Sequence, residues 1–157
     1  MIPTRFLYQL AEYEGITIEW REMERVQGIY LNFPEARTPV IGLAKSLHSN
    51  ERLLRCVLAH ELGHHFLTAG HPSLAASNTS YIYTTKNEHL ATKWAVDLLV
   101  PTDHFLQCIK DGMDGQDLAD YFFVTHDYIK FKSELIQRDE RYSAALSELR
   151  ARYNVVF

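Results

Sequence analysis

The chain has 157 residues, of which 46% are hydrophobic and 23% are charged, and its formal net charge is −4. This length and apolar content suit one globular domain, and no apolar run approaches the roughly 20 residues that a membrane span needs. The slight acidity disfavours broad binding to a phosphate backbone, although a local basic patch would still be compatible with it.

The N-terminal segment predicts a helix and no export signal. Residues 4–14 have the apolar spacing of a short amphipathic helix, and Gly15 follows at its expected end. Acidic residues interrupt this segment, so it lacks the apolar core of a signal peptide. The two cysteines, Cys56 and Cys108, are isolated, which argues against a disulfide framework and a thiolate metal site. We therefore expect a cytoplasmic protein.

Three strand candidates follow the first helix. Residues 16–23 alternate between apolar and polar side chains, and residues 28–33 and 39–47 are further candidates, joined by a turn at 34–37. We expect a small three-stranded sheet directly before the next helix. Within it, residues 40–45 are our candidate for an edge strand that aligns an extended peptide substrate; an ordinary structural strand is the alternative.

The run VLAHELGHHFL contains the pattern HExxH, from His60 to His64. At 3.6 residues per turn the two histidines lie on one helix face, so both imidazoles can reach a single metal ion. Glu61 lies about 100° round the helix, close enough to act on a water without being a ligand. The metal lowers the pKa of that water toward about 7, and the carboxylate takes its proton as the water attacks a carbonyl carbon.

The surroundings of this pattern are those of a partly buried helix. Residues 52–68 have apolar positions on one side, and Glu61 is the only charged residue between Cys56 and Thr68, apart from histidines. Ser49 or Asn50 is the expected N-cap. The alternative is a helix whose two histidines are packed or solvated without any metal.

A catalytic zinc needs a third protein ligand and one open position. The metzincin class places a third histidine ten residues after His60, but that position holds Gly70, and His71 comes one residue late. The other common solution is a carboxylate from a second helix. Residues 86–101, KNEHLATKWAVDLLVP, have helical apolar spacing and end at a proline.

Glu88 is the candidate carboxylate on this second helix. It lies near the expected helix start and on the same face as the small residues Ala91 and Ala95, which would let the two helices approach closely. A first-turn carboxylate that only interacts with the helix dipole is the alternative explanation. His89 is a rival ligand, and Asp97 is a more distant choice.

The two motifs together resemble the ImmA/IrrE family of zinc metallopeptidases. Members pair an AHELGH helix with an ExxAxxFAxxLLxP helix, and this chain has VLAHELGHHFL followed by ExxAxxWAxxLLxP, over about residues 38–101. Trp94 stands where the family usually has Phe. Leu90 and Thr92 stand where it often has Glu or Gln and Asn, which leaves open which groups support the ligands.

The resemblance implies that His60, His64 and Glu88 hold one zinc ion and that Glu61 is the general base. Such a donor set also accepts manganese or iron. The implied fold is α+β and zincin-like: a small twisted three-stranded sheet packed on the two metal helices, then a helical C-terminal part. We expect one domain over residues 1–157, with a core at about 1–101 and a helical subdomain at about 102–157.

Two further segments carry weaker hypotheses. The loop expected at residues 70–85 includes Tyr81 and Tyr83, and it is a candidate lip over the cleft that supplies an oxyanion donor; a plain surface loop is the simpler interpretation. Near the C-terminus, Thr102 is expected to cap a helix to about residue 110, and residues 141–152 have the pattern of a charged amphipathic helix.

Residues 116–136 resemble the first two helices of a helix-turn-helix, with Phe123 at the position where such turns favour glycine. No strongly basic third helix follows, so we interpret this segment as packing structure, with DNA binding as the alternative.

Three functions therefore compete. The first is a zinc endopeptidase; the resemblance implies a regulatory protein substrate, commonly a helix-turn-helix repressor encoded beside the peptidase on a phage or mobile element. The second is a metal-dependent sensor or binding module, and the third is a DNA-binding regulator. The presence of Glu61 beside the ligands favours the first, because a purely structural zinc site needs no general base.

Overall fold

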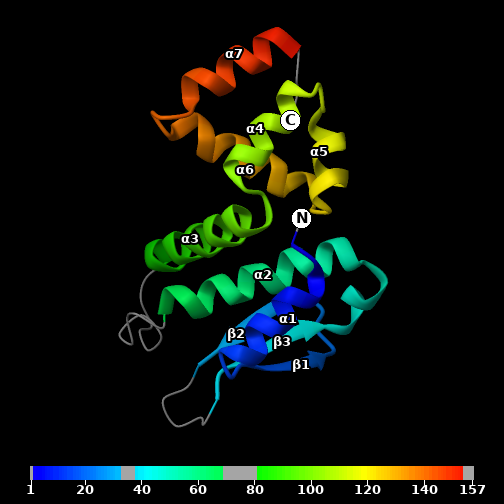
Figure 1. The fold of residues 1–157 in the computed structure, drawn as a ribbon. Helices are drawn as coiled ribbons and strands as arrows, with labels where there is room; N and C mark the ends of the chain where they lie inside the picture. The colour runs from blue at the N-terminus through cyan, green and yellow to red at the C-terminus, as the bar shows by residue number, and fades with distance from the viewer. Residues whose placement is uncertain (1, 33–37, 69–80, 154–157) are drawn as a thin grey trace. The chain divides into compact units, whose positions relative to one another are not determined.

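The computed structural model describes residues 2–32, 38–68 and 81–153 (Figure 1). It confirms the α+β class, with helices and a small three-stranded sheet. The elements are α1 (Thr4–Tyr13), β1 (Thr17–Arg21), β2 (Gly28–Leu31), β3 (Val40–Ala44), the 3-10 helix η1 (Lys45–Ser49), α2 (Glu51–Thr68), α3 (Tyr81–Leu99), α4 (Thr102–Lys110), α5 (Gly115–Phe122), α6 (His126–Arg138) and α7 (Ser143–Tyr153).

The chain divides into two compact units, Ile2–Ala95 and Val96–Phe157, with the boundary inside α3. The first unit contains the sheet, α1, α2 and most of α3, and the second contains the end of α3 and the remaining helices. The expectation of one domain with a subdomain boundary near residue 101 stays a prediction.

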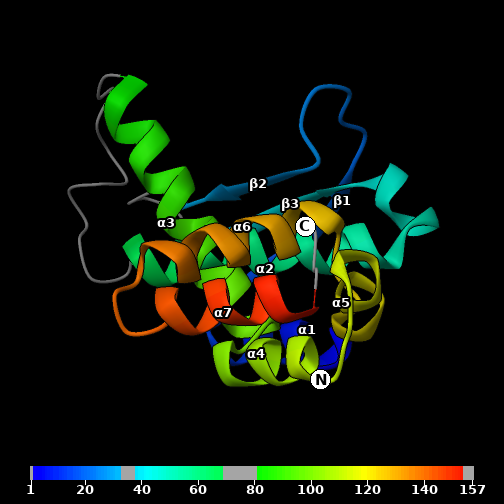
Figure 2. The same cartoon turned by 90° about the horizontal axis from the view of Figure 1, so that it is seen from above.

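In the first unit, α2 packs along β2 and β3, and α1 contacts both α2 and β1 (Figure 1, Figure 2). Ile41 and Leu43 of β3 are fully buried, as are Leu58 and Leu62 of α2, so the apolar face of the sheet is covered by helix. This packing fixes the helix that carries the HExxH pattern against the sheet.

The order of the strands corrects one prediction. The sheet runs β1-β3-β2, with β3 parallel to β1 and antiparallel to β2. Residues 40–45 therefore contain the central strand, whose backbone groups are paired on both sides, and they cannot align a substrate as an edge strand. The almost unbroken apolar run VIGLA of β3 is typical of such a strand. The turn expected at residues 34–37 lies outside the described residues.

The helix α2 starts where it was expected to start. The side-chain Oδ1 of Asn50 accepts a hydrogen bond from the backbone N–H of Leu53 at 3.0 Å, which satisfies one of the free donors of the first turn. Of the two residues proposed as the N-cap, Asn50 is thus the one that makes the capping bond.

The helix α3 starts earlier than expected, at Tyr81 instead of near residue 86. The prediction of a loop that includes Tyr81 and Tyr83 is therefore wrong for those two residues, although Tyr, Ile and Thr favour strands over helices. Gly70, His71 and the rest of the expected lip up to residue 80 lie outside the described residues. Glu88 consequently lies about two turns inside the helix, and it is not a first-turn carboxylate.

The second unit is helical, as predicted. The N-cap position of α4 is held by Pro101, so Thr102 is its first residue and not its cap. Between α5 and α6 the backbone turns at Phe123, which has the left-handed dihedral angles φ 54° and ψ 50° that turn glycines usually supply. Leu118, Val124 and Ile129 are fully buried, which agrees with the interpretation of this segment as packing structure.

None of the helices in the described part of the chain is both long and apolar enough to span a bilayer.

Candidate metal centre

The helix α2 presents His60 and His64 side by side, one turn apart. Their ring centroids are 4.7 Å apart, and their Nε2 atoms are separated by 3.1 Å. The two rings thus direct the same nitrogen atom toward a common point, as the i, i+4 spacing of the pattern predicts.

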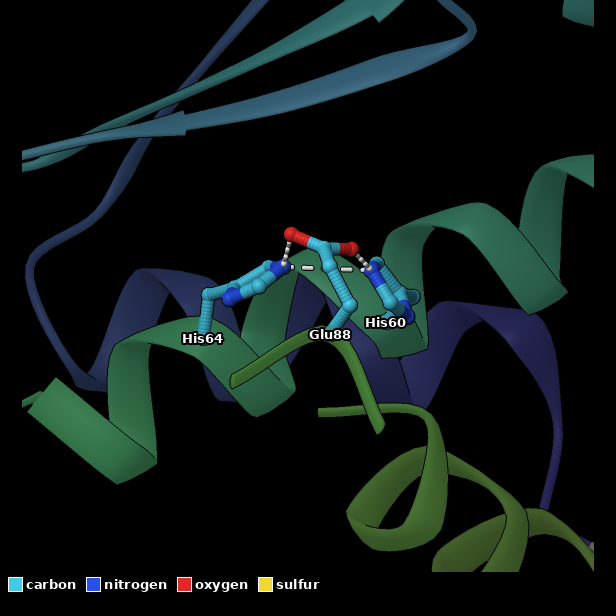
Figure 3. Close-up of side chains that lie close together, drawn as sticks. All are labelled: His60, His64 and Glu88. Atoms are coloured by element: carbon cyan, nitrogen blue, oxygen red, sulfur yellow. Dashed lines mark hydrogen bonds and ion pairs between the residues drawn. The ribbon is translucent and has the colours of Figure 1, made fainter. Parts of the chain in front are cut away.

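Glu88 approaches this point from α3 (Figure 3). Its Oε2 lies 3.0 Å from Nε2 of His60, and its Oε1 lies 3.3 Å from Nε2 of His64. Among the described residues, these three form the only cluster of at least three His, Cys, Asp or Glu side chains whose ligand atoms lie within 4.8 Å of one another. The structure therefore brings together the three residues that the sequence nominated as metal ligands.

The spacing of these atoms suits a small tetrahedral cation. Zinc binds imidazole nitrogen and carboxylate oxygen at about 2.0–2.2 Å, so neighbouring ligand atoms of a tetrahedron are about 3.3 Å apart. The observed separations are 3.0, 3.1 and 3.3 Å. The side chains of His60 and Glu88 are 21% and 52% exposed, so a fourth position would be open to solvent and substrate.

Glu61 has a different environment from Glu88. Its side chain is buried, and the backbone N–H of Tyr30 donates a hydrogen bond to it. Burial, followed by the negative charge of Glu88, raises the pKa of Glu61 to about 8, while the Tyr30 bond opposes that rise. A divalent cation at the neighbouring ligands would favour the ionised carboxylate and lower this pKa.

The strand β2 makes room for Glu61 at Gly28, a residue that the sequence analysis did not single out. A Cβ atom at Gly28 would lie 2.5 Å from Oε1 of Glu61 and 2.6 Å from Cγ1 of Val57. Only a residue without a side chain allows the strand to approach α2 this closely. A glycine at the start of a strand was the available signal, but it points to Glu61 only once the strand order is known.

Comparison with known proteins places the chain in a family. The family described as Peptidase M78, IrrE N-terminal-like domain, matches residues 11–134. The chain belongs to this IrrE-like family. The family expected from the two motifs is thereby confirmed.

A solved structure gives an independent view of the IrrE-like fold. A Mycobacterium tuberculosis transcriptional regulator matches with a TM-score of 0.63 and 17% sequence identity, over 88% of this chain and 43% of that chain. At this identity the likeness concerns the fold alone, and this chain spans less than half of the other chain. The comparison with curated proteins gave no match.

The two motif helices, α2 and α3, approach each other closely beside the candidate metal centre. A Cβ atom at Gly63 would lie 2.6 Å from the carbonyl oxygen of Ala91, so the glycine of HELGH is in backbone contact with α3. Phe66 and Trp94 stack with ring centroids 4.9 Å apart and an interplanar angle of 20°. Trp94 thus supplies the aromatic contact at the position where the family usually has Phe.

His65, adjacent to the candidate ligand His64, has a role apart from the cluster. Its Nδ1 lies 3.0 Å from the hydroxyl of Tyr30, and its Nε2 lies 3.4 Å from Oε2 of Glu14. It is a buried, hydrogen-bonded histidine, and it connects α2 to β2 and to Glu14, the C-cap residue of α1.

The rival ligands do not join the cluster. His89 follows Glu88 on α3 but is not among the grouped side chains. Asp97 accepts a hydrogen bond from the buried ammonium of Lys132 at 2.8 Å within the second unit. These two alternatives for the third ligand are therefore not favoured by the geometry.

Proposed function

We propose that this protein is a zinc-dependent endopeptidase in which His60, His64 and Glu88 hold the metal and Glu61 is the general base. The observation that carries this proposal is the convergence of three ligand atoms at 3.0–3.3 Å, from two helices, beside a buried carboxylate. Membership of a metallopeptidase family supports the same chemistry.

The roles of the residues follow from their environments. Zinc, when bound, polarises water and a peptide carbonyl, which makes the water a nucleophile near neutral pH. Glu61 accepts the proton of the attacking water and passes it to the amine nitrogen of the leaving product. The Tyr30 N–H orients the Glu61 carboxylate, and the burial of this side chain keeps bulk water from competing for the proton.

The edge strand β2 replaces β3 as the candidate for substrate alignment. The backbone N–H of Ala44 bonds to the carbonyl of Gln27, so by the alternation of an antiparallel pair the backbone groups of Gly28 and Tyr30 point away from β3. One of these groups, the Tyr30 N–H, bonds to Glu61. An extended peptide that pairs with this edge would run beside the general base.

The substrate class is proposed to be a regulatory protein, such as a helix-turn-helix repressor of a phage or mobile element, acting in the cytoplasm. Support comes from the resemblance of the two motif helices to a family with such substrates. The structural neighbour is itself a transcriptional regulator. Cleavage of a repressor would release transcription of the genes that it controls.

A metal-dependent sensor or binding module is the second candidate. It needs the metal ligands but gives no reason for the buried carboxylate of Glu61 next to them. Direct DNA binding is disfavoured, because the exposed surface of α5 carries Asp117 and Asp120, which would repel a phosphate backbone.

The test is Glu61→Gln, assayed for cleavage of candidate regulatory proteins, first among them any helix-turn-helix protein encoded beside this protein's gene. The variant keeps the shape of the side chain but cannot act as a base, so we expect zinc content and fold to stay unchanged and cleavage to fall by about 10²–10⁴-fold. Glu24→Gln makes the same change at an exposed carboxylate and should cleave normally. Full cleavage by Glu61→Gln would show that the assigned mechanism is wrong.

A further inference from the structure

The hydroxyl of Thr92 contacts both metal-ligand elements at once. Thr92 lies one turn after Glu88 on α3, and its Oγ1 donates a hydrogen bond to the backbone carbonyl of Glu88 at 2.8 Å. The same Oγ1 lies 3.2 Å from Nδ1 of His60 on α2. A hydroxyl has one proton to donate, and here the carbonyl takes it because a carbonyl can only accept.

The direction of the second hydrogen bond follows from the first. Since the Thr92 proton is already used, its oxygen can only accept from His60, so the imidazole carries its proton on Nδ1. In a neutral ring the lone pair then resides on Nε2. That nitrogen is the atom that faces Glu88 and His64 at the cluster.

We propose that Thr92 is a positioning residue for the metal centre: it holds His60 in the tautomer and ring orientation that direct the Nε2 lone pair at the metal. This inference rests on the proposed function, because it concerns the same site. With the proton on Nδ1, Nε2 of His60 and Oε2 of Glu88 face each other at 3.0 Å as two acceptors. A cation bound between these two acceptors would stabilise the arrangement.

The contact also accounts for a departure from the family pattern. Thr92 stands where IrrE-like proteins often have Asn, and the sequence left open which group supports the ligands. In this chain the Thr92 hydroxyl contacts both the backbone carbonyl of Glu88 and the imidazole of His60. One short side chain thus connects the α3 turn that carries Glu88 to the ring of His60 on α2.

The test compares zinc affinities of Thr92→Val, Thr92→Ser and the wild-type protein by competition with a chromophoric chelator. Valine keeps the shape but cannot accept from His60, so we expect zinc affinity to fall about 10–100-fold. Serine keeps the hydroxyl and should bind within a few-fold of wild type. The visible absorption spectrum of the cobalt-substituted protein should change in Thr92→Val only, since a merely structural role would leave the ligand field intact.

Thr102→Val makes the same chemical change in the second unit and should leave zinc affinity unchanged. Circular dichroism melts establish that each variant is folded, and Thr92→Ala serves in place of Thr92→Val if the valine variant unfolds.

Wild-type affinity and an unchanged cobalt spectrum in Thr92→Val would overturn the inference and leave the proposed function standing. Absence of zinc binding by the wild-type protein would overturn both. Weakened zinc binding in Thr92→Val together with a wild-type protein that cleaves no substrate would support this inference and contradict only the proposed function.

Discussion

At the scale of single residues, the position of the Glu61 carboxylate is set by the groups that surround it. Its buried carboxylate lies against Gly28 and accepts the N–H of Tyr30, while its neighbours His60 and His64 turn their nitrogens toward Glu88. The proposed general base and the proposed third ligand are thus positioned by different elements: Glu61 contacts β2, and Glu88 lies on α3. Changes at β2 should therefore affect catalysis without removing the metal.

Gly28→Ala tests this separation. The new Cβ would meet the Glu61 carboxylate at 2.5 Å, so the carboxylate or the strand must move. We expect proteolysis to fall at least 10-fold, because general bases act only within hydrogen-bond reach, while zinc content stays at the wild-type level. Gly42→Ala on β3 is the matched control, since its Cβ would come within 3 Å only of the Ile29 side chain. Equal loss in both variants, or loss of zinc in Gly28→Ala, would contradict the assignment.

At the scale of elements, the site is a contact between two helices. Gly63 of α2 lies against the backbone of Ala91, and Glu88 comes one turn earlier on that same helix. Phe66 and Trp94 stack further along the same pair. The distance between α2 and α3 therefore decides whether Glu88 reaches the two histidines.

Gly63→Ala should widen this contact. In an isolated helix the change from glycine to alanine would add about 1 kcal/mol of stability. Here the new Cβ would meet the backbone carbonyl oxygen of Ala91, which cannot move without a shift of α3. We expect the free energy of unfolding to fall by about 1–3 kcal/mol and zinc affinity to fall with it. Denaturant unfolding measures the change in the free energy of unfolding, and a zinc titration measures the change in affinity. An increase in stability would mean that the helices do not pack as described.

Much of this contact could be predicted from the sequence. The i, i+4 histidines, the carboxylate at Glu88 and the small Ala91 are all local patterns on amphipathic helices, and the structure groups the three nominated ligands. The position of β3 could not be predicted in the same way, because strand order depends on pairing between segments distant in the chain. For the same reason Gly28 and Tyr30 were missed, since both contact the site from β2. Thr92 was noted only as a departure from the family pattern, because its contact with His60 joins two different helices.

The predicted start of α3 was wrong for a different reason. Residues 81–85 have strand-favouring side chains, and local propensity is a weak guide when a segment continues into a long helix. The error moved the helix start but not the face on which Glu88 lies, so the ligand prediction was unaffected.

At the scale of the whole molecule, the proposed ligands and the general base all belong to the unit Ile2–Ala95. The unit Val96–Phe157 has its own buried core and the ion pair of Lys132 with Asp97, in which the ammonium is almost fully buried. No proposed ligand comes from this second unit. Loss of a ligand should therefore remove the metal without any change in the helical unit.

The zinc content of gently purified protein tests the central claim most directly. Elemental analysis of the wild type and of Glu61→Gln should give about one zinc per chain, as expected for a single three-ligand site. His64→Ala and Glu88→Ala should retain far less, while circular dichroism shows them folded. Stoichiometric zinc in Glu88→Ala, or its absence from the folded wild-type protein, would contradict a metal centre built from His60, His64 and Glu88.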